Sequence, residues 1–132
     1  MALWLERSDG DVIVARRGEN QVLAGLWLPP LAELGVGQEP AEVAQTMLEA
    51  LLRSDEVEAR SLALPNLQPA EPVRHSITRR LITVHPFCGA AGENGRAPQD
   101  DPQCVAWEDP ARPARPTSAL TGKLLRVCRA RA

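Results

Sequence analysis

Seven consecutive residues near the middle of the chain carry the side chains best suited to binding chemistry: Arg74-His-Ser-Ile-Thr-Arg-Arg80. Arginines contact phosphates, an isoleucine can wedge against a base step, and hydroxyls both donate and accept hydrogen bonds. This combination favours contact with nucleic acid. The alternative interpretation is an ordinary β-hairpin turn with solvated arginines, and the segment by itself leaves both open.

The overall composition limits how such a contact can work. The chain has 132 residues, enough for one domain with one hydrophobic core, and its net charge is -2 with a pI near 5.7. A protein that holds DNA unaided usually carries a basic excess, so a nucleic-acid contact here must be local or assisted by another domain. Aromatic residues make up only 3% of the chain, which argues against a stacking platform for single strands.

The cysteines and histidines do not predict a metal site. The spacing of the three cysteines suits neither zinc nor an iron–sulfur cluster, and the two histidines lack a third ligand at a useful distance along the chain. We therefore expect reduced thiols. The sequence has neither an 18-residue apolar stretch nor a signal pattern, so we expect a cytoplasmic, nucleoid-associated protein with no membrane partner.

The alternation of apolar and polar residues predicts an α+β fold. Strands are expected near residues 3–5, 12–15, 26–28, 81–84 and 105–107, weak ones within 57–74, and a polar loop over 89–102. One helix is predicted to begin at Pro40 and end near 53–55, and a second to be capped by Thr117. The apolar residues expected on the inner face of the first helix are Val43, Met47 and Leu51, flanked by Ala44 and Leu48. On the second helix they are Leu120, Leu124 and Val127. This order favours a mixed β-sheet packed between two helices.

Three segments in a fixed order resemble a known family. They are Val12–Arg17, Leu23–Pro30 and Arg74–Val84, and a Trp107 followed by a proline-rich stretch and a basic helix completes the pattern. Together they resemble the C-terminal, Nudix-like domain of adenine DNA glycosylases, the MutY family. The resemblance covers nearly the whole chain and implies a single Nudix-like domain over residues 1–132. An apolar strand begins almost at the first residue, so we expect a domain taken from a longer chain.

The metal-binding signature of Nudix enzymes is missing. In that signature an Arg-Glu pair and a Glu-Glu pair lie on one helix and hold magnesium against a pyrophosphate, because Mg²⁺ prefers several hard oxygen ligands. Here Thr46 and Met47 stand where the Arg-Glu pair belongs, and Ala50 and Leu51 replace the Glu-Glu pair. The sequence therefore favours recognition over hydrolysis.

The central segment matches the family's His-Thr-Phe-Ser/Thr-His turn, which in adenine glycosylases enters DNA beside 8-oxoguanine. Ile77 keeps an apolar side chain in place of the phenylalanine, and Arg79 replaces the second histidine. A hydroxyl at Thr78 can satisfy both the O8 acceptor and the N7 donor that distinguish 8-oxoguanine from guanine. The resemblance implies these DNA- and lesion-binding residues: His75, Ser76, Ile77, Thr78, Arg79 and Arg80.

The resemblance also implies what this chain does not supply. In the family an N-terminal domain excises adenine and usually carries a [4Fe–4S] cluster, so we expect no cofactor and no catalysis in this chain alone. The expected partners are double-stranded DNA containing 8-oxoguanine and the N-terminal glycosylase domain of the parent chain. The alternative is a Nudix-type hydrolase or a binder of oxidised nucleoside triphosphates, for which Glu42, Glu49 and Glu56 are the carboxylates of the helix region.

Overall fold

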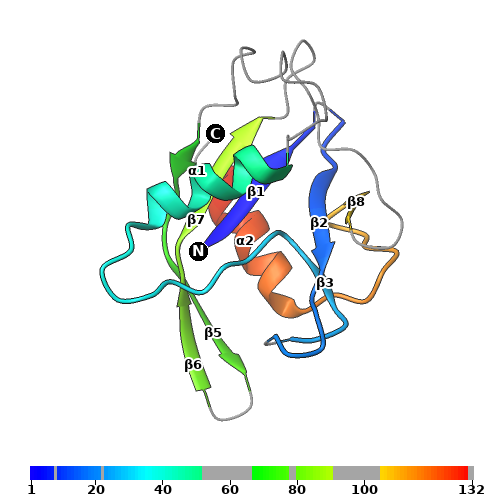
Figure 1. Ribbon diagram of the computed structural model, residues 1–132. Coiled ribbons are helices and arrows are strands. Elements are labelled where there is room, and N and C mark those ends of the chain that lie inside the picture. Colours follow the sequence, from blue (N-terminus) through cyan, green and yellow to red (C-terminus); the bar gives the residue numbers. More distant parts are fainter. Residues whose placement is uncertain (8, 22, 52–66, 78–79, 91–104, 131–132) are drawn as a thin grey trace.

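The computed structural model describes residues 1–7, 9–21, 23–51, 67–77, 80–90 and 105–130 (Figure 1). In these parts of the chain eight strands and two helices follow one another. They are β1 (Ala2–Glu6), β2 (Val12–Arg16), β3 (Trp27–Leu28), α1 (Pro40–Leu51), β4 (Gln68–Pro69), β5 (Val73–Ile77), β6 (Arg80–Val84), β7 (Pro86–Ala90), β8 (Val105–Glu108) and α2 (Ala119–Ala130). Of the segment 57–74, which was predicted to contain one or two weak strands, residues 57–66 lie outside the described residues, and the rest contains β4 and the start of β5. Of the loop predicted over 89–102, residues 91–102 lie outside the described residues, and the prediction is wrong for 89–90, which belong to β7.

Six strands form the main sheet, in the order β3-β2-β1-β7-β4, with β8 paired to β2. β1 and β2 are antiparallel, and Glu6 lies opposite Val12. On its other side β1 runs parallel to β7, with Ala2 opposite Pro86. The sheet is therefore mixed, as predicted. The strands β5 and β6 form a separate antiparallel hairpin.

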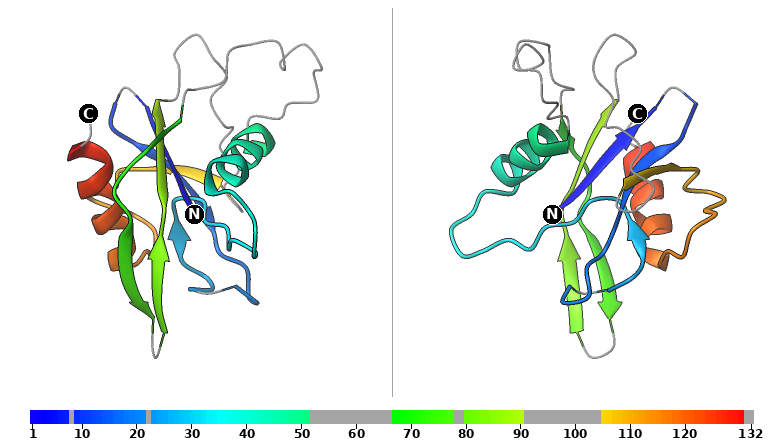
Figure 2. Two further views of the ribbon diagram at one scale, coloured as in Figure 1. Left: turned by 90° about the vertical axis from the view of Figure 1, so that its left-hand side faces the viewer. Right: turned by 45° about the vertical axis from the view of Figure 1, so that its right-hand side comes forward.

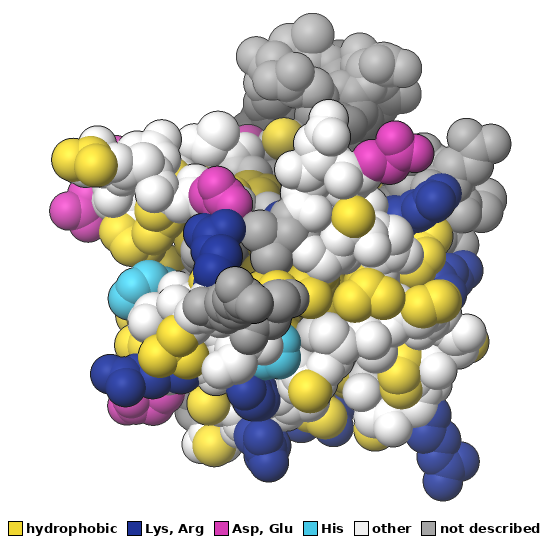
Figure 3. Space-filling view, turned by 90° about the horizontal axis from the view of Figure 1, so that it is seen from below, with side chains coloured by type: hydrophobic (Ala, Val, Ile, Leu, Met, Phe, Trp, Pro, Cys, Tyr) yellow, Lys and Arg dark blue, Asp and Glu magenta, His cyan; other side chains and the backbone are white. Residues whose placement is uncertain are grey.

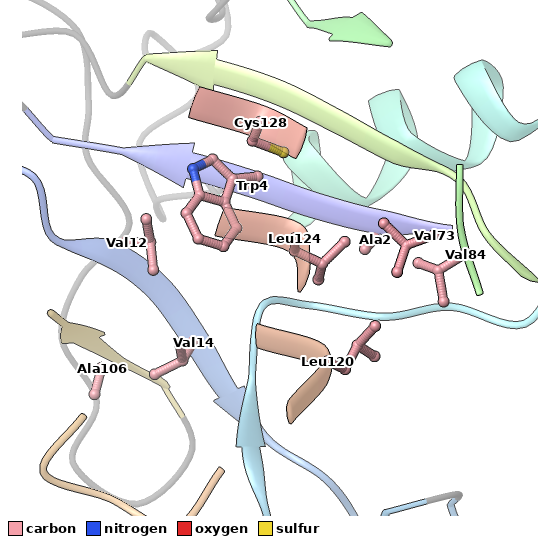
Figure 4. Packing of buried hydrophobic residues seen from close by; sticks show 10 residues of the cluster. All are labelled: Ala2, Trp4, Val12, Val14, Val73, Val84, Ala106, Leu120, Leu124 and Cys128. Atoms are coloured by element: carbon pink, nitrogen blue, oxygen red, sulfur yellow. The ribbon is translucent and has the colours of Figure 1, made fainter. Parts of the chain in front are cut away.

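The two helices cover opposite faces of this sheet, and the alternation along β1 shows why. Leu3 and Leu5 point to the side of α1, where they pack with Leu48. Ala2 and Trp4 point to the other side, into a core that α2 closes (Figures 1, 2 and 4). Since both faces are apolar, all four residues are buried. The predicted arrangement of a mixed sheet between two helices is confirmed.

Some finer predictions about the helices are wrong by about one residue. In α1 the fully buried residues are Ala44 and Leu48, whereas Val43 and Met47 are only half-buried. In α2 the backbone N–H of Leu120 donates to Ser118 Oγ at 3.1 Å, so Ser118 caps this end in place of Thr117. Cys128, not Val127, completes the buried stripe of α2. The two differences in burial reflect how each helix is rotated on the sheet, which apolar spacing fixes only to within one residue.

Candidate nucleic-acid interface

The segment singled out in the sequence forms most of the β5–β6 hairpin, which projects beyond the main sheet (Figures 1 and 2). It was predicted as a turn between strands, and this is wrong in extent. β5 continues to Ile77 and β6 begins at Arg80, so the connection is two residues long. Those two residues, Thr78 and Arg79, lie outside the described residues.

Because the segment is mostly strand, its side chains alternate between two faces. Val73 and His75 are buried, and Ile77 is half-buried, on the face directed towards the body of the protein. Arg74 and Ser76 are exposed on the other face. The structure thus divides the predicted binding residues, and it places Ser76 but not His75 on the outer face.

The base of the hairpin is anchored in the core on the α2 side of the sheet. Val73 lies opposite Val84 in the ladder, and both side chains belong to the buried cluster that includes Leu120 and Leu124 (Figure 4). Four valine and leucine side chains thereby fix the direction in which the hairpin leaves the domain. The outer face of the hairpin lacks such packing further along, since the exposed fraction of Leu81 is 63%.

His75 connects the hairpin to α2. Its exposed fraction is 8%, and its Nδ1 lies 3.1 Å from Lys123 Nζ. The same ammonium donates to the carbonyl oxygen of Arg74 at 3.0 Å. An ammonium can only donate, so the imidazole accepts at Nδ1 and is neutral in this arrangement. In this position the His75 side chain supports the hairpin and is buried away from a partner.

We expect this contact to make the stability of the domain depend on pH. Burial lowers the pKa of His75, and the charge of Lys123 lowers it further. As the pH falls below about 6.5, the ordinary pKa of histidine, the unfolded chain binds a proton that the folded chain resists, so stability falls. In urea unfolding followed at pH 7.5 and 5.5, His75→Gln should lose less stability on acidification than the parent.

The matched control for this prediction is His85→Gln, which removes the other histidine and should keep the acid sensitivity of the parent. One proton can account for at most about 1.4 kcal/mol per pH unit. An identical loss of stability on acidification in the parent and in His75→Gln would show that protonation of His75 does not cause the pH dependence.

The exposed part of the hairpin is basic. Arg74 and Arg80 are exposed, and neither makes an ion pair with another residue that the structure describes. Figure 3 shows the domain from below the view of Figure 1: several lysine and arginine side chains lie on this face, and most of the visible acidic side chains lie towards the upper part of the view. This local excess exists although the net charge of the chain is -2. It can attract phosphates over about one Debye length, roughly 8 Å at physiological salt.

A cleft of about 360 Å³ lies beside the hairpin, between β6 and the segment that precedes α1. Arg17 lines it and is almost fully buried; its guanidinium donates to the carbonyl oxygen of Leu31 at 3.1 Å. Burial lowers the pKa of Arg17, and the nearby charge of Glu33 opposes this shift. An arginine stays protonated in proteins, so the cleft contains a fixed cation, with Arg80 also in its lining.

The helix α1 lacks the Arg-Glu and Glu-Glu pairs with which the corresponding helix of Nudix enzymes holds magnesium. Glu42 and Glu49 are exposed on α1, and the hydroxyl of Thr46 donates to the Glu42 carbonyl oxygen at 3.0 Å. Within the described part of the chain, no group of three or more His, Cys, Asp or Glu residues is placed to hold a metal ion. None of the described helices is long and apolar enough to cross a membrane.

Sequence reasoning missed three features of this region. Leu81 lies opposite Ser76 in the hairpin and is exposed, Lys123 reaches the hairpin from the C-terminal helix, and the cleft collects residues from distant segments. The alternation of β6 could have indicated Leu81 if the strand had been extended to Arg80. The other two depend on tertiary contacts between residues 48 or more positions apart or on the shape of the surface.

The combination of sheet, helices and hairpin defines a Nudix-like α+β domain. The structure is similar to the C-terminal domain of mouse MUTYH, solved in complex with human PCNA, with a TM-score of 0.63 and 20% identity over 95% of this chain and 82% of that one. It is also similar to the E. coli ORF135 protein, with a TM-score of 0.60 and 17% identity over 98% of this chain and 86% of that one.

A Nudix hydrolase of M. smegmatis, RenU, is similar as well, with a TM-score of 0.58 and 15% identity over 95% of this chain and 80% of the hydrolase. No family model matches the sequence. A search among curated proteins finds no significant match. These comparisons show the fold, which is shared by the C-terminal domain of mouse MUTYH and by a Nudix hydrolase.

Proposed function

We propose that this domain is the non-catalytic lesion-recognition part of an A/G-specific adenine DNA glycosylase, which reads 8-oxoguanine opposite adenine in base-excision repair. The observation that carries the proposal is the projecting hairpin. It presents exposed arginines and a hydroxyl next to the turn that resembles the family's lesion-reading turn. Its base is fixed by the core, so the tip is held in a defined direction.

The proposed mechanism is binding and positioning. Arg74 and Arg80 contact phosphates and set the register on the duplex without reading sequence. Ser76 and Thr78, which is two positions further along the chain, offer hydroxyls that can donate to O8 and accept from N7–H of the lesion. Adenine excision then belongs to an N-terminal domain of the same parent chain, together with its [4Fe–4S] cluster. The proposed localisation is the cytoplasm, in association with the nucleoid.

The affinity of the chain for DNA tests this proposal. With one small basic hairpin and a negative net charge, the chain alone should bind duplex DNA with a Kd of roughly 10⁻⁴–10⁻⁶ M at physiological salt. Fluorescence anisotropy with labelled duplexes that contain 8-oxoguanine·A or G·A pairs measures this. Nanomolar binding by the chain alone would contradict an assisted module, and no binding even at low salt would contradict a DNA-binding function.

The cleft favours a second candidate function, the binding of an oxidised nucleoside triphosphate. Arg17 and Arg80 provide two cations in the lining of a 360 Å³ space, which is within the usual size range of small-molecule sites. Calorimetric titration with 8-oxo-dGTP separates the candidates. The nucleotide-binding function would be favoured if the chain binds 8-oxo-dGTP with micromolar affinity, if Arg80→Ala abolishes this binding, and if the chain does not bind DNA.

A further inference from the structure

We propose that the bases of duplex DNA are met by one face of the hairpin, formed by Arg74, Ser76, Leu81 and Thr83, and that Leu81 is its apolar contact with them. This inference rests on the proposed DNA-binding function and specifies the surface that performs it. It also changes which apolar residue is involved, because the sequence pointed to Ile77.

The ladder between β5 and β6 defines this face. Ser76 lies opposite Leu81, and Arg74 lies opposite Thr83. Residues that are opposite each other in an antiparallel pair point to the same side, with Cβ atoms about 5 Å apart. These four side chains therefore form a continuous patch. Arg74, Ser76, Leu81 and Thr83 are all exposed.

Ile77 belongs to the opposite face. It shares the orientation of Val73 and His75, which point towards the protein, and it is half-buried. Leu81 is 63% exposed, although it lies within a strand and near the tip of the hairpin. Among the described residues only one other large apolar side chain is classed as exposed, that of Val36 in the loop before α1. The apolar wedge expected from the sequence is therefore better provided by Leu81.

The charge of the hairpin identifies the partner. From Val73 to Val84 the sequence contains three arginines and no acidic residue. Two hydroxyls and one leucine lie on the same face as Arg74. Proteins that bind in the minor groove combine basic and polar side chains with an apolar residue, often leucine, that partly unstacks a base step. This composition fits a DNA duplex.

The test uses a duplex with 2-aminopurine at the central step, because the fluorescence of this base rises when it is unstacked. The chain is titrated at low salt, where phosphate contacts are strongest, and anisotropy of a second label reports binding. The variant is Leu81→Thr, which replaces the apolar side chain with a β-branched one that is suited to a strand. Val36→Thr removes the other exposed apolar side chain and is the matched control. Ile77→Thr tests the competing face.

We expect Leu81→Thr to bind about tenfold more weakly, the loss that corresponds to one apolar side chain, and to lose the 2-aminopurine signal. Val36→Thr should behave as the parent. If Leu81→Thr retains parental affinity and signal while the parent binds DNA, the assignment of Leu81 is overturned and the proposed function stands. A loss confined to Ile77→Thr would likewise overturn the choice of face. If the parent itself does not bind, both proposals fail.

Discussion

Replacing Leu48 with alanine is expected to lower the free energy of unfolding by about 2–5 kcal/mol, the cost of a cavity left by a buried leucine. Leu48 is fully buried on α1 and packs with Leu3, Leu5 and Ile13 of the sheet. A domain of this size is stable by only about 5–15 kcal/mol, so the loss is large. Urea unfolding of the parent and the variant, followed by the fluorescence of the tryptophans, measures it.

Glu49→Ala, one position further on, is the matched control and should change stability by no more than about 0.5 kcal/mol, because Glu49 is exposed. A comparison of the parent with Glu49→Ala also tests whether α1 has a catalytic role. If the helix only supports the sheet, neither the parent nor Glu49→Ala should release pyrophosphate from 8-oxo-dGTP with Mg²⁺. Steady release by the parent that disappears in Glu49→Ala would make α1 a catalytic helix and would support the hydrolase alternative.

The strands and helices with strong apolar patterns could be predicted from the sequence. β1, β2 and α1 have uninterrupted runs or helical spacing, and α1 begins at Pro40, as predicted. β7 was missed, although it pairs with β1 in the middle of the sheet. Its sequence, Pro-Phe-Cys-Gly-Ala, contains residues that are rare inside strands. It becomes a strand because β1 offers a parallel edge, and Pro86 is tolerated since it is the first residue.

The candidate site could be located along the chain but not oriented from the sequence. The segment does connect two strands, but it was predicted to lie between them, whereas residues 74–77 and 80 belong to the strands themselves. Because the period of a strand is two residues, that difference decides which side chains point outwards. It turned His75 into a buried partner of Lys123 and brought Leu81 onto the outer face. Contacts between the hairpin and α2 have no local signal in the sequence.

Replacing Thr78 with valine is expected to reduce discrimination between 8-oxoguanine·A and G·A by about 1–3 kcal/mol, the scale of one good base contact. Valine keeps the shape of threonine and removes the hydroxyl, so the donor and the acceptor offered to the lesion disappear together. The measurement compares the kcat/KM values for the two substrates in a protein that joins this chain to its proposed glycosylase domain. Thr78 lies outside the described residues, so this stays a prediction from the sequence and from the direction of the hairpin.

Arg80→Ala should act differently, because a phosphate contact carries no sequence information. It should weaken the binding of both substrates alike. The slope of the logarithm of affinity against the logarithm of salt concentration should fall by about 1, as expected for the loss of one phosphate contact. Arg112→Ala, which removes an exposed arginine from the loop after β8, is the matched control and should change neither quantity. If Thr78→Val leaves the substrate ratio unchanged, or if Arg80→Ala changes that ratio most, the turn does not read the lesion. The hairpin would then contribute only charge, and the similarity to the MUTYH domain would describe a shared fold alone.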